Sequence, residues 1–351
     1  MGAMSNELRV AVVGATGAVG RTMTEILEER GFPVGSFVPL ASERSAGSRV
    51  RFRDEDHTVG VLSLEALRGV DLALVSAGAS VSKGFIPQAA EAGTTCIDNS
   101  SAFRMDPDVP LVVPEVNPEA LEGTPPPRVI AVPNCTTIAA MLAIGPLHRA
   151  AGLRSLVMSS YQSVSGAGMK GTRELAEQIE KLRGQEETLG DADFDSLPFG
   201  EVMGKTIAYN VVPKIGAFEP GGYTDEEAKM MAEPRKILGL PDLPMVATSV
   251  RVPVPVGHGV SLVAAFSRPI GVDEARQILR SAPSVELRDD PEHDVYPSPL
   301  ESAGLDVALV GRVRQVEHDP SALVLFSCAD NLRLGAALDA VHVAEHLFAR
   351  R

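Results

Sequence analysis

Cys135 is the residue of this chain best placed to act as a nucleophile. It follows a proline-asparagine pair in the stretch VPNCTTIAAM, and the apolar spacing of Ile138, Met141 and Leu142 predicts a helix that begins just after it. A sulfur at a helix N-terminus lies near unpaired backbone N–H groups and the positive end of the helix dipole, which favours the thiolate. The same N–H groups can hold the oxyanion of a tetrahedral adduct. The alternative is a small buried side chain at a strand end.

A thiol nucleophile needs a base, and His258 is the candidate. It lies in the stretch VGHGV, where glycine on both sides leaves the imidazole approachable at the end of an apolar strand. A histidine in a turn is also compatible with a merely exposed side chain. The other two cysteines, Cys96 and Cys328, lie in apolar strand-like runs, and three cysteines form neither an even disulfide framework nor a zinc cluster. We therefore expect all three to be free thiols, with Cys96 and Cys328 buried.

A glycine-rich turn near the start of the chain is suited to a phosphate group. Gly14, Gly17 and Gly20 have GxxGxxG spacing between the strand-like run LRVAVV and the helical run RTMTEILEER. Close backbone approach and a helix N-terminus together favour a dinucleotide pyrophosphate. The alternative is a tight turn between strand and helix that binds nothing.

The segment ASERSAG after the second strand points to the form of the cofactor. An NAD enzyme usually places an acidic side chain on the ribose hydroxyl here, whereas Ser42, Arg44 and Ser45 can hold the 2′-phosphate of NADP. Glu43 must then point away from the phosphate. A solvated polar loop is the alternative.

The elements that position these residues predict two domains. The first part of the chain alternates strands and helices, which is typical of a parallel sheet with crossovers. From about Ala151 the strands become valine-rich and alternating, which favours a sheet with one packed face in an α+β domain. The terminal apolar stripe predicts a helix that returns to the first domain. We assign residues 1–134, completed by a helix over 332–351, to an NADP-binding domain, residues 135–331 to a catalytic and dimerisation domain, and residues 183–204 to a long loop.

Composition limits the function further. The formal net charge is −14 and 44% of the residues are hydrophobic, so the chain is globular and acidic. Such a surface opposes binding to nucleic acid or to an anionic membrane. We expect no membrane span and no signal peptide, and therefore a cytoplasmic protein. The first three residues, MGA, are interpreted as a remnant before a native start at Met4.

One motif suggests a different chemistry. The stretch HVAEH, from His342 to His346, matches the H-x-x-E-H signature of zinc proteases. The chain has no carboxylate downstream to complete such a site, and the helical apolar stripe already explains the pattern. We therefore predict no metal.

Nine motifs together resemble, in order and spacing, those of aspartate-semialdehyde dehydrogenases. The resemblance runs from Val10 to the terminal helix, and the motifs are GATGAVG, ASERSAG, SAG, IDNSSAFRMD, VPNCTT, YQSVSGAG, DEEAKM, RVPVPVGHG and ADNLRLGAA. It implies a Rossmann-type domain followed by a catalytic α+β domain, an architecture similar to that of glyceraldehyde-3-phosphate dehydrogenase. It also implies a homodimer formed through the second domain.

The resemblance implies NADPH-dependent reductive dephosphorylation of L-4-aspartyl phosphate to L-aspartate 4-semialdehyde. This step serves lysine (through diaminopimelate), threonine and methionine biosynthesis, and it passes through a cysteine thioester. Cys135 matches the nucleophile, His258 the acid/base and Gln162 the glutamine that orients the reacting group.

Further roles are implied by the same motifs. Arg104 and Lys229 resemble phosphate ligands, Arg251 the carboxylate clamp and Glu226 the partner of the substrate ammonium, while Asn134 is assigned to the substrate with them. A capping box of Thr224 and Glu227 is predicted to open the helix that carries Glu226 and Lys229. Each of these charged residues is also compatible with a solvated surface role. The implied cofactor residues are Gly14, Thr16, Gly17, Ala18, Val19, Gly20, Ser42, Arg44, Ser45, Ser165, Gly166 and Asn331.

Two other functions remain open from sequence. One is the same chemistry on N-acetylglutamyl phosphate, although the run PNCTT fits the aspartate branch better. The other is a non-catalytic NADP-binding paralogue. Such paralogues lose the nucleophile, so the presence of Cys135 and His258 argues against it.

Overall fold

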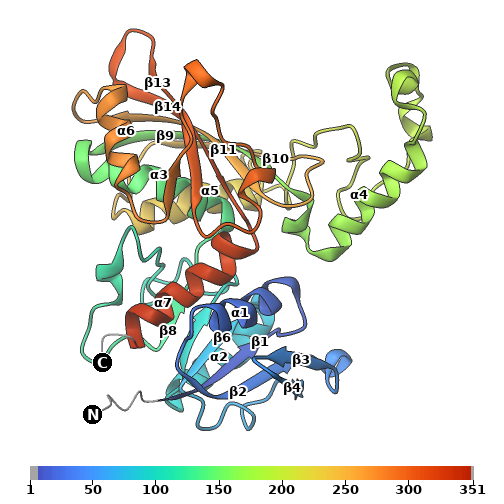
Figure 1. Cartoon of the computed structure of the whole chain (residues 1–351), viewed down its shortest axis with the longest axis vertical. Coiled ribbons are helices and arrows are strands. Elements are labelled where there is room, and N and C mark those ends of the chain that lie inside the picture. The colour runs from blue at the N-terminus through green and yellow to red at the C-terminus, as the bar shows by residue number, and fades with distance from the viewer. Residues whose placement is uncertain (1–6, 349–351) are drawn as a thin grey trace. The chain divides into compact units, whose positions relative to one another are not determined.

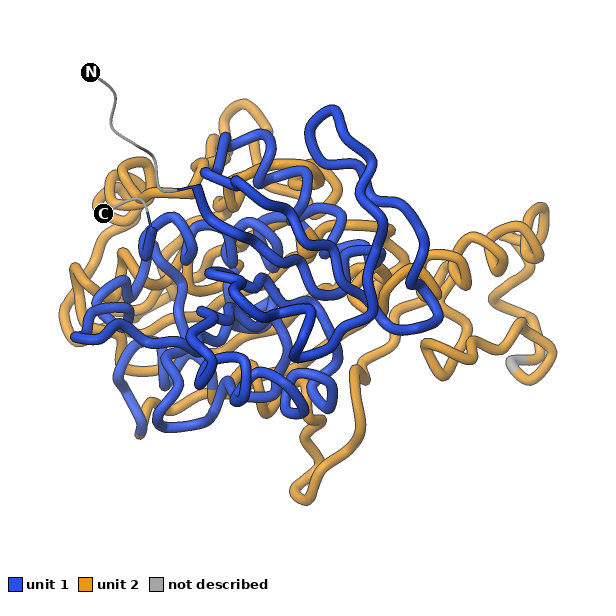
Figure 2. Tube along the Cα trace, turned by 90° about the horizontal axis from the view of Figure 1, so that it is seen from below, with its two compact units in different colours: residues 1–138, 233–241, 333–351 blue, residues 139–232, 242–332 orange. Residues whose placement is uncertain are grey.

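The computed structural model describes residues 7–348, so Met4 and the last three residues lie outside the described part. The chain divides into two compact units, which Figure 2 distinguishes by colour. Unit 1 combines the chain up to Ile138 with Glu233–Pro241 and the segment from Arg333 onward. Unit 2 contains Ala139–Ala232 and Asp242–Leu332. Unit 1 therefore includes two segments, residues 135–138 and Glu233–Pro241, that the sequence prediction assigns to the second domain.

Unit 1 is built on a six-stranded sheet in which every neighbouring pair of strands is parallel (Figure 1). The strand order is β5-β2-β1-β6-β7-β8, and the separate two-stranded sheet pairs β3 with β4. The strands are β1 (Leu8–Val13), β2 (Val34–Ala41), β3 (Arg49–Phe52), β4 (Glu55–Thr58), β5 (Gly60–Val61), β6 (Leu72–Val75), β7 (Thr95–Asp98) and β8 (Val129–Ala131). The helices are α1 (Ala18–Glu29), α2 (Ala79–Glu91) and α7 (Asp339–Phe348).

Apolar residues cover both faces of this sheet, as its near-continuous valine and leucine runs predict. Successive residues of β6 point to opposite faces, yet all four are buried. On one face, Ala73 and Val75 join a core cluster with Phe85 and Ile86 of α2. Helix α7 contacts β6 and β7 and also contacts α1. The expected parallel dinucleotide-binding architecture is confirmed.

Unit 2 contains a mixed sheet of order β10-β9-β11-β14-β13-β12. Strand β11 pairs antiparallel with β9 and β14, and β10 pairs parallel with β9. The strands are β9 (Leu153–Gln162), β10 (Met245–Arg251), β11 (His258–Phe266), β12 (Val285–Leu287), β13 (Ala308–Val316) and β14 (Asp319–Ala329). The helices are α3 (Cys135–Ala151), α4 (Met169–Leu182), α5 (Asp225–Ile237) and α6 (Val272–Arg280), of which α3 begins and α5 ends within unit 1.

The sheet of unit 2 has one buried face and one exposed face. Buried and exposed residues alternate along β9 and β10, which confirms the pattern expected from the valine-rich segments. The exposed face carries several apolar side chains, with Val157 at 43%, Tyr161 at 40% and Val246 at 48% exposure. Helix α4 extends away from this sheet, at the right of Figure 1.

Two details differ from the sequence prediction. The terminal helix does not begin as an α-helix, because Arg333–Leu338 forms a π-helical segment before α7. Periodicity of three to four residues does not distinguish a short π segment from an α-helix. The stretch over 183–204, expected to be a plain loop, contains two 3₁₀ turns, Glu186–Asp191 and Phe194–Ser196.

Candidate active site

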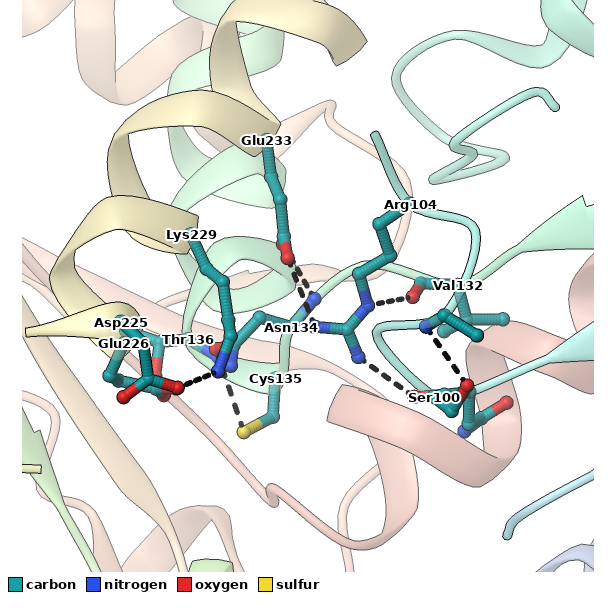
Figure 3. Close-up of polar contacts among 12 residues, drawn as sticks. Ser100, Arg104, Val132, Asn134, Cys135, Thr136, Asp225, Glu226, Lys229 and Glu233 are labelled. Carbon is teal, nitrogen blue, oxygen red and sulfur yellow. Dashed lines mark hydrogen bonds and ion pairs between the residues drawn. The ribbon is translucent and has the colours of Figure 1, made fainter. Parts of the chain in front are cut away.

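Cys135 is the first residue of helix α3, so its sulfur lies at a helix N-terminus as predicted. The side-chain oxygen of Asn134 accepts a hydrogen bond from the Thr136 N–H at 2.9 Å and lies 3.9 Å from Cys135 Sγ (Figure 3). Asn134 therefore acts as the helix cap and fixes the backbone on both sides of the cysteine.

Only Cys135 has the environment of a reactive thiol. All three cysteines are free, as expected, but Cys96 and Cys328 are buried whereas Cys135 is partly exposed. Burial raises the pKa of the Cys96 thiol to about 12 and raises the pKa of the Cys328 thiol as well. These two thiols stay protonated and unreactive at neutral pH.

Arg104 lies in unit 1 at the carboxyl edge of the parallel sheet, and it is nearly buried. Its guanidinium donates to the carbonyl oxygen of Val132 at 2.9 Å and to that of Asn99 at 2.7 Å. These two residues directly follow β8 and β7, where ligands bind in open α/β sheets. The third contact is an ion pair with Glu233 at 3.0 Å (Figure 3). Sequence reasoning missed Glu233, whose only signal is its position four residues after Lys229.

The glycine-rich turn has the backbone geometry that a phosphate site requires. Gly14 has φ 84°, and a Cβ there would collide with the carbonyl oxygen of Ser76. A Cβ at Gly20 would collide with the Gly14 carbonyl, and Gly17 is the N-cap of α1. Gly14 and Gly20 are therefore required by the turn itself, and the turn leaves the N-terminus of α1 without a side-chain cap. Thr16, Ala18 and Val19 complete this segment.

The residues expected to hold the 2′-phosphate follow β2. Ser42 precedes a single 3₁₀ turn, Glu43–Ser45. Ser42, Glu43 and Arg44 are exposed and Ser45 is half-buried. The end of β2 lies beside the glycine-rich turn, because the N–H groups of Gly14 and Ala15 donate to the Leu40 carbonyl. The 3₁₀ turn that follows β2 therefore keeps Arg44 at the carboxyl end of the sheet, next to the glycine-rich turn. Exposed donors at this edge fit a dinucleotide phosphate.

His258 begins β11 in unit 2 and is 1% exposed. Its Nδ1 accepts a hydrogen bond from the Ser163 N–H at 3.1 Å and lies 3.0 Å from the Ser163 hydroxyl. Because an N–H group can only donate, the neutral ring carries its proton on Nε2. Nε2 is buried and has no partner among the described residues. Burial and the nearby positive charge of Arg251 lower the pKa of His258 to about 3.

Three polar residues of unit 2 form a buried network behind His258. The Asn331 side-chain oxygen accepts from the Ser163 hydroxyl at 3.0 Å, and its amide nitrogen donates to the Ser165 hydroxyl at 3.0 Å. The same oxygen accepts from the Gly257 N–H at 3.0 Å, directly before His258. The network therefore orients the imidazole. Ser163 was not predicted, although it lies inside the YQSVSGAG motif.

Gly166 allows close approach at this point of unit 2. A Cβ there would lie 2.8 Å from Arg251 Nη1 and 3.2 Å from the His258 ring. Arg251 is nearly buried, and its Nη1 donates to the Ser163 carbonyl at 2.6 Å. The imidazole, the guanidinium and Gly166 are thus packed against one another.

Gln162, Glu226 and Lys229 form a second polar group in unit 2. Gln162 donates to Glu226 at 3.0 Å, and both side chains are buried. Lys229 Nζ lies 3.5 Å from Glu226 and 2.8 Å from Asp225 (Figure 3). Together with Arg251 this unit presents both a carboxylate and cations, which suits a zwitterionic ligand.

The start of helix α5 is fixed by the predicted capping box, which is confirmed. The Thr224 N–H donates to Glu227 at 2.8 Å, and the Glu227 N–H donates to the Thr224 hydroxyl at 3.3 Å. Glu227 also accepts from the Ser249 N–H at 2.9 Å, which ties the helix to β10.

The zinc-protease pattern lies on α7. His342 Nδ1 is 2.8 Å from Glu115, so one ring nitrogen is already engaged by a carboxylate. Over residues 7–348, no group of three or more histidine, cysteine or acidic side chains is arranged to hold a metal ion. Within the same residues, no helix is long and apolar enough to cross a membrane.

Comparison with known families first defines the class of protein to which the chain belongs. Residues 9–124 match the NAD-binding domain of semialdehyde dehydrogenases, and residues 144–334 match the semialdehyde dehydrogenase dimerisation domain. The first match agrees with the glycine-rich turn, and the second contains His258 and the residues around it.

Individual relatives then identify the family within this class of protein. The chain is 44% identical to an aspartate-semialdehyde dehydrogenase of Aquifex aeolicus, over 97% of each chain. It is 46% identical to that of Streptomyces akiyoshiensis, over 96% of this chain and 98% of the relative. A Vibrio cholerae aspartate semialdehyde dehydrogenase II, solved in complex with ASA, superimposes with a TM-score of 0.89 at 42% identity over 98% of both chains. The chain belongs to the aspartate-semialdehyde dehydrogenase family and is an oxidoreductase that acts on an aldehyde group.

Proposed function

We propose that the protein catalyses the reversible, NADPH-dependent reductive dephosphorylation of L-4-aspartyl phosphate to L-aspartate 4-semialdehyde. The observation that carries this proposal is the position of Cys135, a partly exposed thiol at the N-terminus of α3, in a chain that aligns over nearly its full length with members of this family. The step would supply lysine, threonine and methionine biosynthesis.

Cys135 is the proposed nucleophile. Its sulfur attacks the acyl carbon, the carbon–oxygen bond to phosphate breaks, and the thiol proton leaves with the phosphate, which yields a thioester. The nicotinamide cofactor, when bound, supplies the hydride that reduces the acyl group. When the carbon–sulfur bond breaks, the aldehyde is released and the cysteine leaves as a thiolate, which takes up a proton from solvent to restore the thiol. The N–H groups at the start of α3 stabilise the negative oxygen in both halves of the reaction.

His258 is the proposed acid/base, and it acts through Nε2. In the resting state this nitrogen carries the ring proton, so it donates a hydrogen bond to the oxygen that becomes negative. The pKa of His258 is lowered by burial and by Arg251. A substrate carboxylate on Arg251 would offset that positive charge, and a phosphate anion would act in the same direction. Substrate binding therefore raises the proton affinity of the ring.

The substrate groups are assigned by charge. Arg104 and Lys229 bind phosphate, Arg251 binds the carboxylate and Glu226 binds the ammonium. Gln162, held by Glu226, orients the reacting group, and Asn134 contacts the substrate beside Cys135.

NADP is the proposed cofactor. The turn at Gly14, Gly17 and Gly20 would hold the pyrophosphate with Thr16, Ala18 and Val19, and Ser42, Arg44 and Ser45 would hold the 2′-phosphate. Ser165, Gly166 and Asn331 would lie beside the nicotinamide. The turn itself supports this fit, because it leaves the N-terminus of α1 without a side-chain cap.

We further propose a cytoplasmic homodimer. The match of residues 144–334 to the semialdehyde dehydrogenase dimerisation domain supports dimerisation through unit 2. The exposed apolar side chains of β9, β10 and β11 support it as well. Three free cysteines are compatible with a reducing compartment.

One assay tests the proposed reaction. Aspartate semialdehyde oxidation is followed by NADPH absorbance, with and without phosphate, and N-acetylglutamate semialdehyde is offered in parallel. We expect phosphate-dependent NADPH formation with the aspartate compound only. Turnover of the N-acetylglutamyl compound would point to the related reductase, and turnover of neither would point to a binding paralogue.

A further inference from the structure

We infer that Glu233 is a positioning residue that couples the phosphate-binding guanidinium of Arg104 to the backbone that carries Cys135. This inference rests on the proposed function, because it assumes that Arg104 binds phosphate and that Cys135 is the nucleophile. All of the residues that carry it belong to unit 1.

One carboxylate joins two groups far apart in sequence. Oε1 of Glu233 accepts from Arg104 Nη1 at 3.0 Å, and Oε2 accepts from the backbone N–H of Asn134 at 2.7 Å. Asn134 directly precedes Cys135 and caps helix α3. The distance between the anion-binding side chain and the nucleophile is therefore set through a single side chain (Figure 3).

Burial makes this bridge rigid. Glu233 is 0% exposed and Arg104 is 8% exposed, so neither charge is solvated and each needs the other. Arg104 has five N–H donors, and acceptors within residues 7–348 use three of them, on Val132, Asn99 and Glu233. Two donors remain for a ligand, and the three contacts fix the direction in which they point.

The next turn of the same helix holds the backbone of Arg104. Lys236 Nζ donates to the carbonyl oxygens of Arg104 at 2.8 Å, Asp106 at 2.6 Å and Val109 at 2.7 Å. An ammonium group has three donors, and all three are used here. The end of α5 thus holds Arg104 by both its backbone and its guanidinium.

A carboxylate is required at position 233 because two donors converge on it. Glutamine has one carbonyl oxygen and one amide nitrogen, so its NH₂ group would face either the Arg104 guanidinium or the Asn134 N–H. Glu233→Gln therefore breaks one arm of the bridge while keeping the size of the side chain.

The test compares Glu233→Gln with Asp289→Asn. Asp289 is a matched control, because its side chain is 2% exposed and its carboxylate likewise accepts from an arginine, Arg276 Nε at 2.8 Å, and from a backbone N–H, that of Val313 at 3.3 Å, but neither partner is a proposed site residue. Two quantities are measured for each protein. The first is KM for phosphate and for NADP during semialdehyde oxidation, and the second is the phosphate concentration that half-protects Cys135 from iodoacetamide.

We expect Glu233→Gln to raise both KM for phosphate and the half-protecting phosphate concentration by roughly tenfold, which is the effect of one lost charge-assisted hydrogen bond. KM for NADP should stay within twofold of the parent value. Asp289→Asn should lower the unfolding temperature but leave KM for phosphate and the half-protecting phosphate concentration within twofold. Glu233→Asp, which keeps the charge but is one methylene shorter, gives a second variant should the glutamine protein not fold, and its phosphate values should also rise.

A double-mutant cycle decides whether Glu233 acts through Arg104. In an Arg104→Ala background, Glu233→Gln should change the phosphate values by less than twofold. An equally large effect in that background, or unchanged phosphate values in folded Glu233 variants, overturns the inference. If phosphate neither supports turnover nor protects Cys135 in the parent protein, the proposed function fails instead.

Discussion

Replacing His258 with glutamine should change how the stability of the protein depends on pH. His258 is 1% exposed, and burial followed by the charge of Arg251 lowers its pKa from the ordinary 6.5 to about 3. Between these two pH values the unfolded chain binds a proton at this position and the folded chain does not. Lowering the pH through this window therefore favours unfolding, and the stability that neutral His258 retains at pH 8 is lost as the pH falls.

The size of the effect follows from the two pKa values. Each pH unit inside the window changes the free energy of unfolding by up to about 1.4 kcal/mol, so lowering the pH from 8 to 5 should cost about 2 kcal/mol through His258 alone. Other groups titrate over the same range, including His148, whose pKa is also lowered by burial. Their contributions cancel when the free energy of unfolding of the variant is subtracted from that of the parent protein at each pH.

The measurement is reversible urea unfolding of the parent and of His258→Gln at pH 8, 7, 6 and 5. The free energy of unfolding of the parent should fall by about 2 kcal/mol more than that of the variant. His318→Gln serves as a control, because the His318 side chain is 90% exposed, and it should leave the profile unchanged. A constant difference between parent and His258→Gln across this range would refute the reasoning that the ring is buried in its neutral form.

Three further predictions concern the proposed reaction. Cys135→Ala should abolish turnover and leave NADP binding intact, and an electrophilic substrate analogue should label Cys135 alone by mass spectrometry, since the other two cysteines are buried; labelling of either would contradict the assignment. Lys229→Ala should raise KM for phosphate with little change for NADP, and equal changes in both would remove Lys229 from the phosphate site. Arg44→Ala should weaken NADP by roughly ten- to a hundredfold and scarcely affect NAD, because a charge-assisted hydrogen bond contributes about 1.5–3 kcal/mol. That assignment fails if the ratio of kcat/KM for the two cofactors is the same in parent and variant.

Local sequence patterns were sufficient for the scaffold and for the start of the candidate site. The apolar spacing after Cys135 predicted helix α3, which begins at that residue. Thr224 and Glu227 predicted the capping box that opens α5. Such features depend on residues within one or two turns of each other, so their spacing in sequence already contains the geometry.

Sequence periodicity was less informative at the end of the chain. The apolar stripe correctly indicated a terminal helix, but Arg333–Leu338 is π-helical. A single wider turn shifts the hydrogen bonds by one residue and leaves the apolar pattern almost unchanged. Only the backbone coordinates distinguish the two.

The polar contacts that orient the candidate site were decided by tertiary structure. Glu233 and Arg104 are 129 residues apart, and Ser163 and His258 are 95 residues apart. No local spacing relates such residues, because folding of the strands and helices brings them together. The sequence indicated which side chains could carry the chemistry, since a thiol and an imidazole are identifiable by type, whereas the cations were assigned only through resemblance to the family. The buried partners that fix the proton on His258 Nε2 and hold Arg104 beside the Asn134 backbone follow from packing, since a buried charge or donor must find a partner wherever the fold places it.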